Sequence, residues 1–226
     1  MTMSSRTGAA DVLEALGVRI DHDAKTARAR LLNPGVAFLF APLYHPAMRH
    51  VAPVRKELGF RTIFNLLGPI CNPAGVKRQL LGIFSEKWLV PVAEVLRELG
   101  AERAWVVHGS GNLDEMSTLG PTKVALLDRG EIVLREVTPE EAGLERGDVT
   151  KLKGGSAPEN AAAIRLLLRG ERTPFRDIVL LNSGAALVVA GLADSIRGGV
   201  SLASAAIDEG RAAEVLESCR AADAKT

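Results

Sequence analysis

The feature that most constrains the fold is the alternation of short apolar runs with longer segments of helical periodicity. QLLGIF (79–84) and AWVVHG (104–109) have the length and composition of buried strands, and the EKWLVPVAEVLRELG segment between them repeats its apolar residues at helical spacing. Parallel strands need a crossover connection of about a dozen residues, usually a helix. The pattern therefore predicts an α/β fold with a central, largely parallel sheet and flanking helices.

The same two periods predict the remaining elements. VAFLFA (36–41) is a continuous apolar run, typical of a strand covered on both faces. TKVALLDRGEIVLREV has the pattern of a hairpin that turns at residues 128–130. Helices are predicted at 9–16, 24–32, 46–59 with a kink or restart at Pro53, 62–67 ending at Gly68-Pro69, 156–168 with capping-box spacing, 177–193 and 201–218.

Composition excludes several classes of function. The chain has 226 residues, a net charge of +1 and 4% aromatic residues, so it lacks the basic excess and the stacking surface of nucleic-acid-binding proteins. No apolar run has membrane-spanning length, and the N-terminus has no signal-peptide core. Cys71 and Cys219 lie far apart, which favours two free thiols in a reducing compartment. We expect a cytoplasmic protein with no nucleic-acid or membrane partner.

Two adjacent acids, Asp114 and Glu115, follow the predicted strand AWVVHG within the segment HGSGNLDEMS. Ligands of open α/β sheets bind beyond the carboxyl ends of strands, and the glycines at 109 and 111 allow the backbone to approach a ligand closely. Two carboxylates there suit Mg²⁺ shared with substrate phosphates, although spacing alone favours a solvated acidic turn. His108 has a general acid–base role or a structural role at the strand end.

A basic stretch, YHPAMRHVAPVRKELGFR, places His45 and Arg55 ten residues apart, near three helical turns. An arginine on such a face can grip a substrate carboxylate with both arms, and a solvated basic helix side is the alternative. LKGGSAPENA places two glycines before a helix N-terminus, which is a potential anion site, although the capping box already explains Ser156 and Glu159.

Three blocks together resemble anthranilate phosphoribosyltransferase. They are FLFAPLYHPAMRHVAPVRKELGFRTIFNLLGPICNPA, VVHGSGNLDEMS and LKGGSAPENAAAIRLLL, and the likeness runs from about Ser4 to the last predicted helix. RTIFNLLGP followed by HGxxxLDE is a specific combination. The resemblance implies transfer of a phosphoribosyl group from phosphoribosyl pyrophosphate to the amine of anthranilate, in tryptophan biosynthesis. The implied reaction is a displacement at the anomeric carbon through an oxocarbenium-like transition state.

The resemblance also assigns residues. It makes Asp114 and Glu115 the Mg²⁺ ligands, with the metal neutralising charge on the departing pyrophosphate. No side chain acts as a covalent nucleophile, so positioning and charge stabilisation carry the acceleration. The anthranilate-binding residues that it implies are Arg55, His45, Gly68 and Pro69.

Some blocks of the family pattern are absent from the sequence: the glycine-rich GTGGD loop, an NxST segment and KHGN. Ser4 and Ser5 match the tail of the phosphate-binding loop, and Ala9 stands where relatives carry a serine, so phosphoribosyl pyrophosphate is expected to contact these three residues. We expect residues 1–226 to form the α/β domain of the C-terminal two-thirds of such an enzyme. Residues 45–72 would belong to its truncated helical domain, and the full-length family is expected to be homodimeric.

Three alternatives stay open. A shortened, inactive paralogue would act as a binding or assembly partner. A DNA-binding relative of the same fold is disfavoured by the near-neutral charge. A phosphorylase of pyrimidine nucleosides shares the fold, but the block around Arg55 suits an aromatic acid better than a nucleobase.

Overall fold

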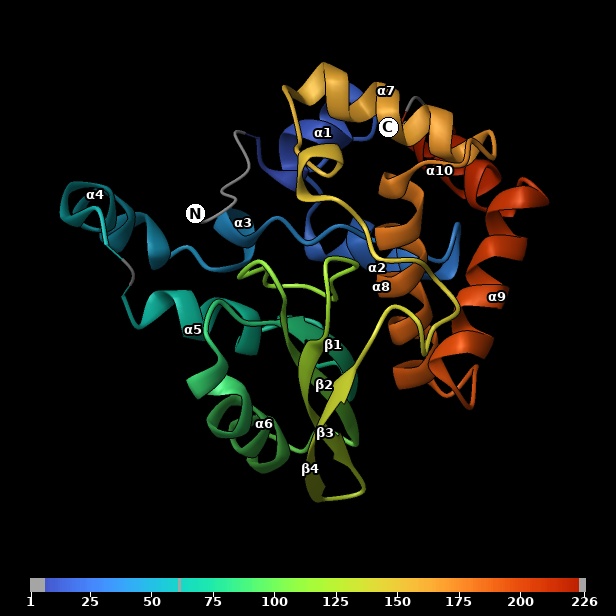
Figure 1. Ribbon diagram of the computed structural model, residues 1–226. Helices are drawn as coiled ribbons and strands as arrows, with labels where there is room; N and C mark the ends of the chain where they lie inside the picture. Colours follow the sequence, from blue (N-terminus) through green and yellow to red (C-terminus); the bar gives the residue numbers. More distant parts are fainter. Residues whose placement is uncertain (1–6, 61, 224–226) are drawn as a thin grey trace. The chain divides into compact units, whose positions relative to one another are not determined.

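The computed structural model describes residues 7–60 and 62–223, and these form two compact units (Figure 1). Unit 1 contains residues 74–153 and 170–209. Unit 2 contains residues 7–60, 62–73, 154–169 and 210–223. Each unit has its own core, and we describe each by itself.

A mixed sheet of four strands forms the centre of unit 1. In space the strands follow the chain order: β1 (Arg78–Gly82), β2 (Arg103–Gly109), β3 (Thr122–Asp128) and β4 (Glu131–Val137). β1 and β2 are parallel, and the β2–β3 and β3–β4 pairs are antiparallel. The predicted α/β class is confirmed, but the expected largely parallel sheet is corrected to one parallel pair among the described strands. Only the β1–β2 connection carries a crossover helix, which a parallel pair requires.

The predicted hairpin is confirmed between β3 and β4. Its two central residues, Arg129 and Gly130, have φ angles of 48° and 86°. Two consecutive positive φ angles are typical of a type I′ turn, whose twist matches that of the flanking strands. Asp128 accordingly faces Glu131 across the end of the hairpin.

Helices cover both faces of this sheet. α6 (Leu89–Glu98) follows a short 3₁₀ turn, η1 (Glu86–Trp88), and packs against β2 and β3, whereas α8 (Pro174–Ala190) packs against β1 and β2. Figure 1 shows these two helices on opposite sides of the strands. Ala104–Val107 of β2 are buried without interruption, as expected for a strand covered on both faces. A second 3₁₀ turn, η2 (Val149–Lys151), and α9 (Ile196–Asp208) complete the unit.

The regular elements in the described residues of unit 2 are all helices. α1, α7 and α10 meet around Val12, Leu16, Ala161 and Leu216. Ser156 and Glu159 form the predicted capping box of α7, which supplies partners for N–H groups of its first turn. The helices are α1 (Ala9–Ala15), α2 (Ala24–Leu32), α3 (Ala41–Tyr44), α4 (Met48–Leu58), α5 (Phe64–Ile70), α7 (Ala157–Leu168) and α10 (Arg211–Asp223).

Four local predictions need correction. The run at 36–41 is not a strand: residues 36–40 are irregular and residue 41 begins α3. A strand needs a neighbouring strand to pair with, and none of the described strands pairs with this run. α4 continues through Pro53 without a restart, and α5 continues through Gly68-Pro69 to Ile70. The last predicted helix is two helices, since Gly210 adopts a φ of 79° between α9 and α10.

An ionic cluster fastens α10 to α2 within unit 2. Asp223 forms an ion pair with Arg30, and its Oδ1 lies 3.3 Å from Nε2 of His22. The Arg19 backbone N–H donates to Oδ2 of Asp223 at 2.9 Å, and Nη1 of Arg30 donates to the Cys219 carbonyl at 2.8 Å. The side chains of Arg30 and Asp223 are only 7% and 5% exposed. Each buried charge is therefore neutralised mainly by the other.

Unit 1 contains a comparable but more open pair. Nη2 of Arg176, near the start of α8, donates to both carboxylate oxygens of Asp208 at 2.8 Å. The Arg176 side chain is 4% exposed and that of Asp208 is 42% exposed. Across the described residues, no helix combines the length and apolarity that crossing a membrane requires.

Candidate functional site

The loop that follows β2 carries the acid pair. β2 ends at Gly109, and Asp114 and Glu115 lie beyond the carboxyl ends of the parallel strands β1 and β2, in unit 1. Ligands of α/β sheets bind at this edge. The structure therefore places both predicted metal ligands where the fold presents functional groups.

The loop begins with a tight turn. The backbone N–H of Gly109 donates to the Leu113 carbonyl at 2.8 Å, and the Leu113 N–H donates back to the Gly109 carbonyl at 3.2 Å. Between them Gly111 and Asn112 have φ angles of 85° and 59°. Glycine and asparagine are the residues that adopt this left-handed region at low cost, so GSGN encodes the turn that precedes the acids.

Two glycines let this loop lie directly on the sheet. A Cβ atom on Gly82 would be 1.5 Å from the Asp114 carbonyl oxygen, and one on Gly109 would be 2.4 Å from the Glu115 carbonyl oxygen. No side chain fits in such spaces. The backbone of the acid pair is consequently packed against the ends of β1 and β2, and the carboxylates extend from it.

Glu115 borders a cavity of about 260 Å³ in unit 1. Desolvation by the surrounding protein raises the pKa of the Glu115 carboxyl, and the neighbouring charge of Asp114 raises it further. A cation between the two carboxylates would reverse the second effect, because it favours their ionised forms. The cavity is lined by Leu113, Glu115, Leu152, Phe175, Ile178, Val179, Asn182 and Ser183.

The donor set of this loop fits Mg²⁺. Among the described residues there is no cluster of three or more histidine, cysteine, aspartate or glutamate side chains that could enclose a metal. Mg²⁺ does not need such a cluster, since it retains several waters and binds through one or two carboxylates together with substrate phosphates. The exposed Asp114 and Glu115, held on a fixed backbone, offer the hard oxygen ligands for such a site.

His108 has a structural contact. Its Nδ1 lies 2.9 Å from the Ile83 carbonyl oxygen, next to the end of β1. The hydrogen bond joins the ends of the two parallel strands, and it occupies one of the two ring nitrogens. This favours the structural role over general acid–base catalysis.

The predicted anthranilate-binding residues all belong to unit 2. Half-buried His45 follows α3 and precedes α4, whereas Arg55 is within α4, so the two do not share one helix face. The side chain of Arg55 lies outside the described part of the structure. Gly68 and Pro69 are exposed residues of α5.

The residues predicted to contact phosphoribosyl pyrophosphate fall near the start of the chain. Ser4 and Ser5 lie outside the described residues. Ala9 is exposed and opens α1 in unit 2. These three assignments and those of the anthranilate residues stay predictions.

The glycine pair before α7 already has intramolecular partners. The Gly155 N–H donates to Oδ1 of Asn160 at 2.8 Å, and the Ser156 N–H donates to Oε2 of Glu159 at 2.7 Å. Two N–H groups that an anion would need are thus used by side chains. This favours the capping interpretation over the anion site.

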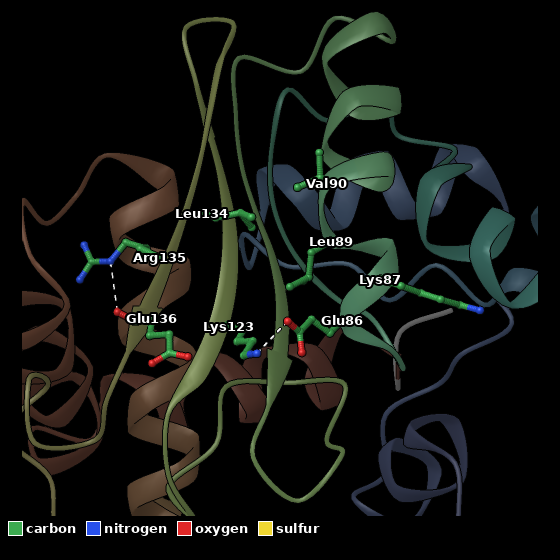
Figure 2. A pocket seen from close by; sticks show the side chains of 8 residues that line it. All are labelled: Glu86, Lys87, Leu89, Val90, Lys123, Leu134, Arg135 and Glu136. Carbon is green, nitrogen blue, oxygen red and sulfur yellow. Dashed lines mark hydrogen bonds and ion pairs between the residues drawn. The ribbon is translucent and has the colours of Figure 1, made fainter.

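A larger cleft, of about 730 Å³, lies between η1, the start of α6 and the β3–β4 hairpin. Figure 2 shows its charged side chains around Leu89, Val90 and Leu134. Nζ of Lys123 donates to Oε1 of Glu86 at 2.7 Å, and the Lys87 ammonium lies 5.4 Å from the centre of the Trp88 ring. These charges interact with neighbours in the protein, and the acid pair is not part of the cleft.

Two residues that organise the acid loop were not predicted from the sequence. Gly82 is a lone glycine within a strand pattern, which was an available signal of close backbone approach, and Asn182 stands inside the apolar segment IVLLNSGAALVVA. A polar residue in the apolar part of a helix was the available signal for Asn182, because buried polar groups need hydrogen-bond partners. Asn182 contacts Met116, the residue directly after the acid pair.

Comparison with known proteins identifies the family. Residues 1–213 match the family described as "Glycosyl transferase family, a/b domain". The chain belongs to this glycosyl transferase family, in agreement with its α/β fold and with the acid loop at the carboxyl ends of the strands.

Within the family, the predicted resemblance is confirmed. The chain is 57% identical to anthranilate phosphoribosyltransferase of Brucella ovis, over 95% of this chain and 63% of that protein. The crystal structure of anthranilate phosphoribosyltransferase from Thermus thermophilus superposes with a TM-score of 0.89 at 48% identity, covering 96% of this chain and 64% of that one.

The structure of the Saccharomyces cerevisiae anthranilate phosphoribosyltransferase in complex with PRPP and Mg has a TM-score of 0.90 at 28% identity, covering 97% of this chain and 63% of that one. The chain spans 63% of the length of the curated relatives that it matches.

Proposed function

We propose that the chain takes part in the anthranilate phosphoribosyltransferase reaction of tryptophan biosynthesis. This reaction transfers the phosphoribosyl group of phosphoribosyl pyrophosphate to anthranilate and gives N-(5-phosphoribosyl)anthranilate and pyrophosphate. The observation that carries the proposal is the 57% identity to such enzymes over 95% of this chain. The fixed acid loop at the carboxyl ends of β1 and β2 supplies the matching chemistry.

Asp114 and Glu115 would hold Mg²⁺. When bound, the metal supplies positive charge that stabilises the departing pyrophosphate. The two carboxylates belong to a loop whose backbone lies directly against Gly82 and Gly109. They therefore need little reorganisation as charge develops, which is the condition for effective electrostatic stabilisation. The S. cerevisiae neighbour solved with PRPP and Mg supports the choice of Mg²⁺ as the metal.

The residues of unit 2 would bind the acceptor. Arg55 would grip the carboxylate of anthranilate with its planar guanidinium, with His45, Gly68 and Pro69 around the aromatic ring. The anthranilate nitrogen then forms a bond to the anomeric carbon while the bond from that carbon to the pyrophosphate oxygen breaks, and the amine loses a proton. Alignment of the two substrates is the main contribution of the protein. A neighbour solved with 4-fluoroanthranilate supports this substrate class.

The pKa of Glu115 gives this site a pH dependence. Because desolvation and the charge of Asp114 raise that pKa, Glu115 stays protonated to a higher pH than an isolated glutamate does. Protonated Glu115 is a poor metal ligand, so Mg²⁺ affinity should increase as pH rises through the raised pKa. Metal binding should release protons over the same interval.

The test is an assay of the purified chain with anthranilate, phosphoribosyl pyrophosphate and Mg²⁺, in which both products are measured by mass spectrometry. We expect metal-dependent formation of N-(5-phosphoribosyl)anthranilate, reduced at least about a hundredfold in the Asp114→Asn/Glu115→Gln double variant, since removed electrostatic contacts cost about 10²–10³ in rate. Glu86→Gln, in the separate cleft of Figure 2, is the matched acid control.

Absence of both products from the folded wild-type chain would contradict the proposal. It would favour the alternative of an inactive relative that acts as a binding or assembly partner. The homodimer, the cytoplasmic location, and the assignment of residues 45–72 to a helical domain stay predictions.

A further inference from the structure

Asn182 connects α8 to the acid loop through both ends of its side-chain amide. Its Oδ1 accepts a hydrogen bond from the Met116 N–H at 2.9 Å, and its Nδ2 donates to the Met116 carbonyl at 2.9 Å. Nδ2 also donates to the Ile178 carbonyl, one turn earlier in α8, at 2.9 Å. The amide thus uses one acceptor and both donors, and its orientation is determined by three partners.

This contact fixes the residue directly after the acids. Met116 is completely buried, and its own N–H and C=O are both satisfied by Asn182 instead of by a strand. On the other side of the acids, Leu113 pairs with Gly109. Asp114 and Glu115 are exposed, and the residue on each side of them is held by two hydrogen bonds: Leu113 by Gly109, and Met116 by Asn182.

The helix that carries Asn182 is itself firmly placed. Gly184, two residues further, packs against α9 so closely that a Cβ there would be 2.7 Å from the Val200 nitrogen. Ile178, Leu181 and Ala185 of α8 are buried. Asn182 consequently transmits the position of a rigid helix to the loop.

We propose that Asn182 is a positioning residue for the metal ligands Asp114 and Glu115. It binds neither metal nor substrate; it holds the Met116 backbone so that the two carboxylates point from a fixed loop. The inference rests on the proposed function only through the metal-binding role of the acid pair. Partners that orient metal ligands contribute about 10- to 100-fold in metal affinity, and we expect a loss of about tenfold when this contact is removed.

The chain offers a matched control in unit 2. Asn160 of α7 holds Gly155 in the same manner, accepting from its N–H at 2.8 Å and donating to its carbonyl at 3.2 Å. Asn160→Ala removes the same type of contact, at a place in the sequence 40 or more residues from the acid pair. Its metal affinity should equal that of the wild type.

The experiment measures Mn²⁺ binding, with pyrophosphate present, from the electron paramagnetic resonance signal of free Mn²⁺. The whole chain is used, and hydrogen exchange of the Met116 amide is followed in parallel. The variants are Asn182→Ala, Asn182→Asp, Asn160→Ala and the double variant Asp114→Asn/Glu115→Gln. The proposal predicts about tenfold weaker Mn²⁺ binding and faster Met116 exchange in Asn182→Ala, with neither change in Asn160→Ala.

Asn182→Asp protects the test against a folding defect of the alanine variant. Aspartate keeps the acceptor for the Met116 N–H but loses the donor to the Met116 carbonyl, and its charge would attract a cation. Weaker Mn²⁺ binding in folded Asn182→Asp therefore supports a positioning role. Binding as tight as in the wild type, in either folded Asn182 variant, overturns it.

Failure of the proposed function has a different signature. If wild type and the Asp114→Asn/Glu115→Gln variant bind Mn²⁺ equally, the acid pair is not the metal site, and the positioning role falls with it. Failure of the inference alone shows as a loss of binding in the double variant with unchanged binding in the Asn182 variants.

Discussion

The two units differ in how closely their backbones pack at glycine. In unit 1, a Cβ on Gly82 would be 1.5 Å from the Asp114 carbonyl oxygen, and a Cβ on Gly199 would be 2.3 Å from the Gly184 carbonyl oxygen. In unit 2, Gly59 and Gly68 have no such neighbour within 4 Å. Unit 1 thus holds the acid loop by direct contact between main chains, whereas these glycines of unit 2 lie in open surroundings.

Unit 2 also carries strongly exposed apolar side chains. Leu32, Phe60 and Ile63 are 84%, 66% and 59% exposed. Its tightest feature is ionic: Arg30, Asp223 and His22 are buried together between α2 and α10. The comparison teaches that unit 1 supports its charged groups on closely packed main chain, whereas unit 2 relies on a buried ionic cluster beside the apolar cluster around Val12 and Leu16.

The largest expected effect concerns that cluster. Asp223→Ala would leave the guanidinium of Arg30 buried without its counter-ion, so we expect a loss of about 3–5 kcal/mol in the free energy of unfolding of unit 2. Urea denaturation followed by circular dichroism at 222 nm measures it. Asp208→Ala, which removes a half-exposed partner of Arg176, should cost less. Equal losses would contradict the distinction between closed and open pairs.

Gly82→Ala tests the close packing of unit 1. The added methyl group collides with backbone, which cannot rotate away, and overpacking of this kind costs about 3 kcal/mol. Trp88 and Trp105, the two tryptophans of the chain, both belong to unit 1, so tryptophan fluorescence during denaturation reports this unit. A stability within about 1 kcal/mol of wild type would show that the loop moves aside easily.

Gly68→Ala is the contrasting substitution in unit 2. Gly68 is within α5, and apart from its chain neighbours nothing lies within 4 Å of an added Cβ. Alanine gains about 0.5–1 kcal/mol over glycine in a helix, but Pro69 disfavours a helical residue with a Cβ directly before it and offsets part of that gain. Stability should therefore change by less than about 1 kcal/mol, as measured by circular dichroism on thermal melting. A loss of about 3 kcal/mol would mean that this glycine is as tightly surrounded as Gly82, and the comparison between units would fail.

Glu115→Gln has the smallest expected effect and depends on pH. The pKa of Glu115 is raised in the folded state, so the folded state binds protons more tightly than the unfolded state, and the ionised side chain reduces stability above the raised pKa. Glutamine should therefore increase stability at pH 7 by about 0.5 kcal/mol or less, since solvent screens a surface charge. Below the unfolded value of 4.5 the difference should vanish.

The control for this last prediction is Glu86→Gln. Glu86 receives a hydrogen bond from Lys123, so removing its charge should not stabilise the chain at pH 7. Stabilisation by Glu115→Gln that persists unchanged at pH 4 would refute the pKa argument. The gain would then not depend on whether the Glu115 carboxyl is ionised or protonated.

Sequence patterns predicted those elements whose residues repeat with a clear period. α2, α7 and the β3–β4 hairpin follow from apolar spacing, capping residues and turn residues, all of which are local. The expectation of a largely parallel sheet was wrong, because the β2–β3 and β3–β4 connections carry no helix and these strands pair antiparallel. The strand predicted at 36–41 was wrong because a strand also needs a partner, which an apolar run does not specify.

The acid pair was found from the sequence because its loop follows directly on a strand. Gly82 and Asn182 were not, although they hold that loop, because their contacts join residues 32 and 66 positions apart in the chain. Such contacts form only after folding. The periodicity of the sequence does not indicate that Gly82 in β1 makes space for the Asp114 carbonyl in the loop that follows β2.

The position of β4 in the sheet has one more consequence. In the described part of the chain β4 pairs with β3 alone, and Val133 and Leu134 on it are 54% and 61% exposed. An apolar strand with free main-chain groups can recruit strands of other molecules and start aggregation. This edge strand also carries three charged residues, Glu131, Arg135 and Glu136. Their charges oppose β-pairing between molecules at this edge.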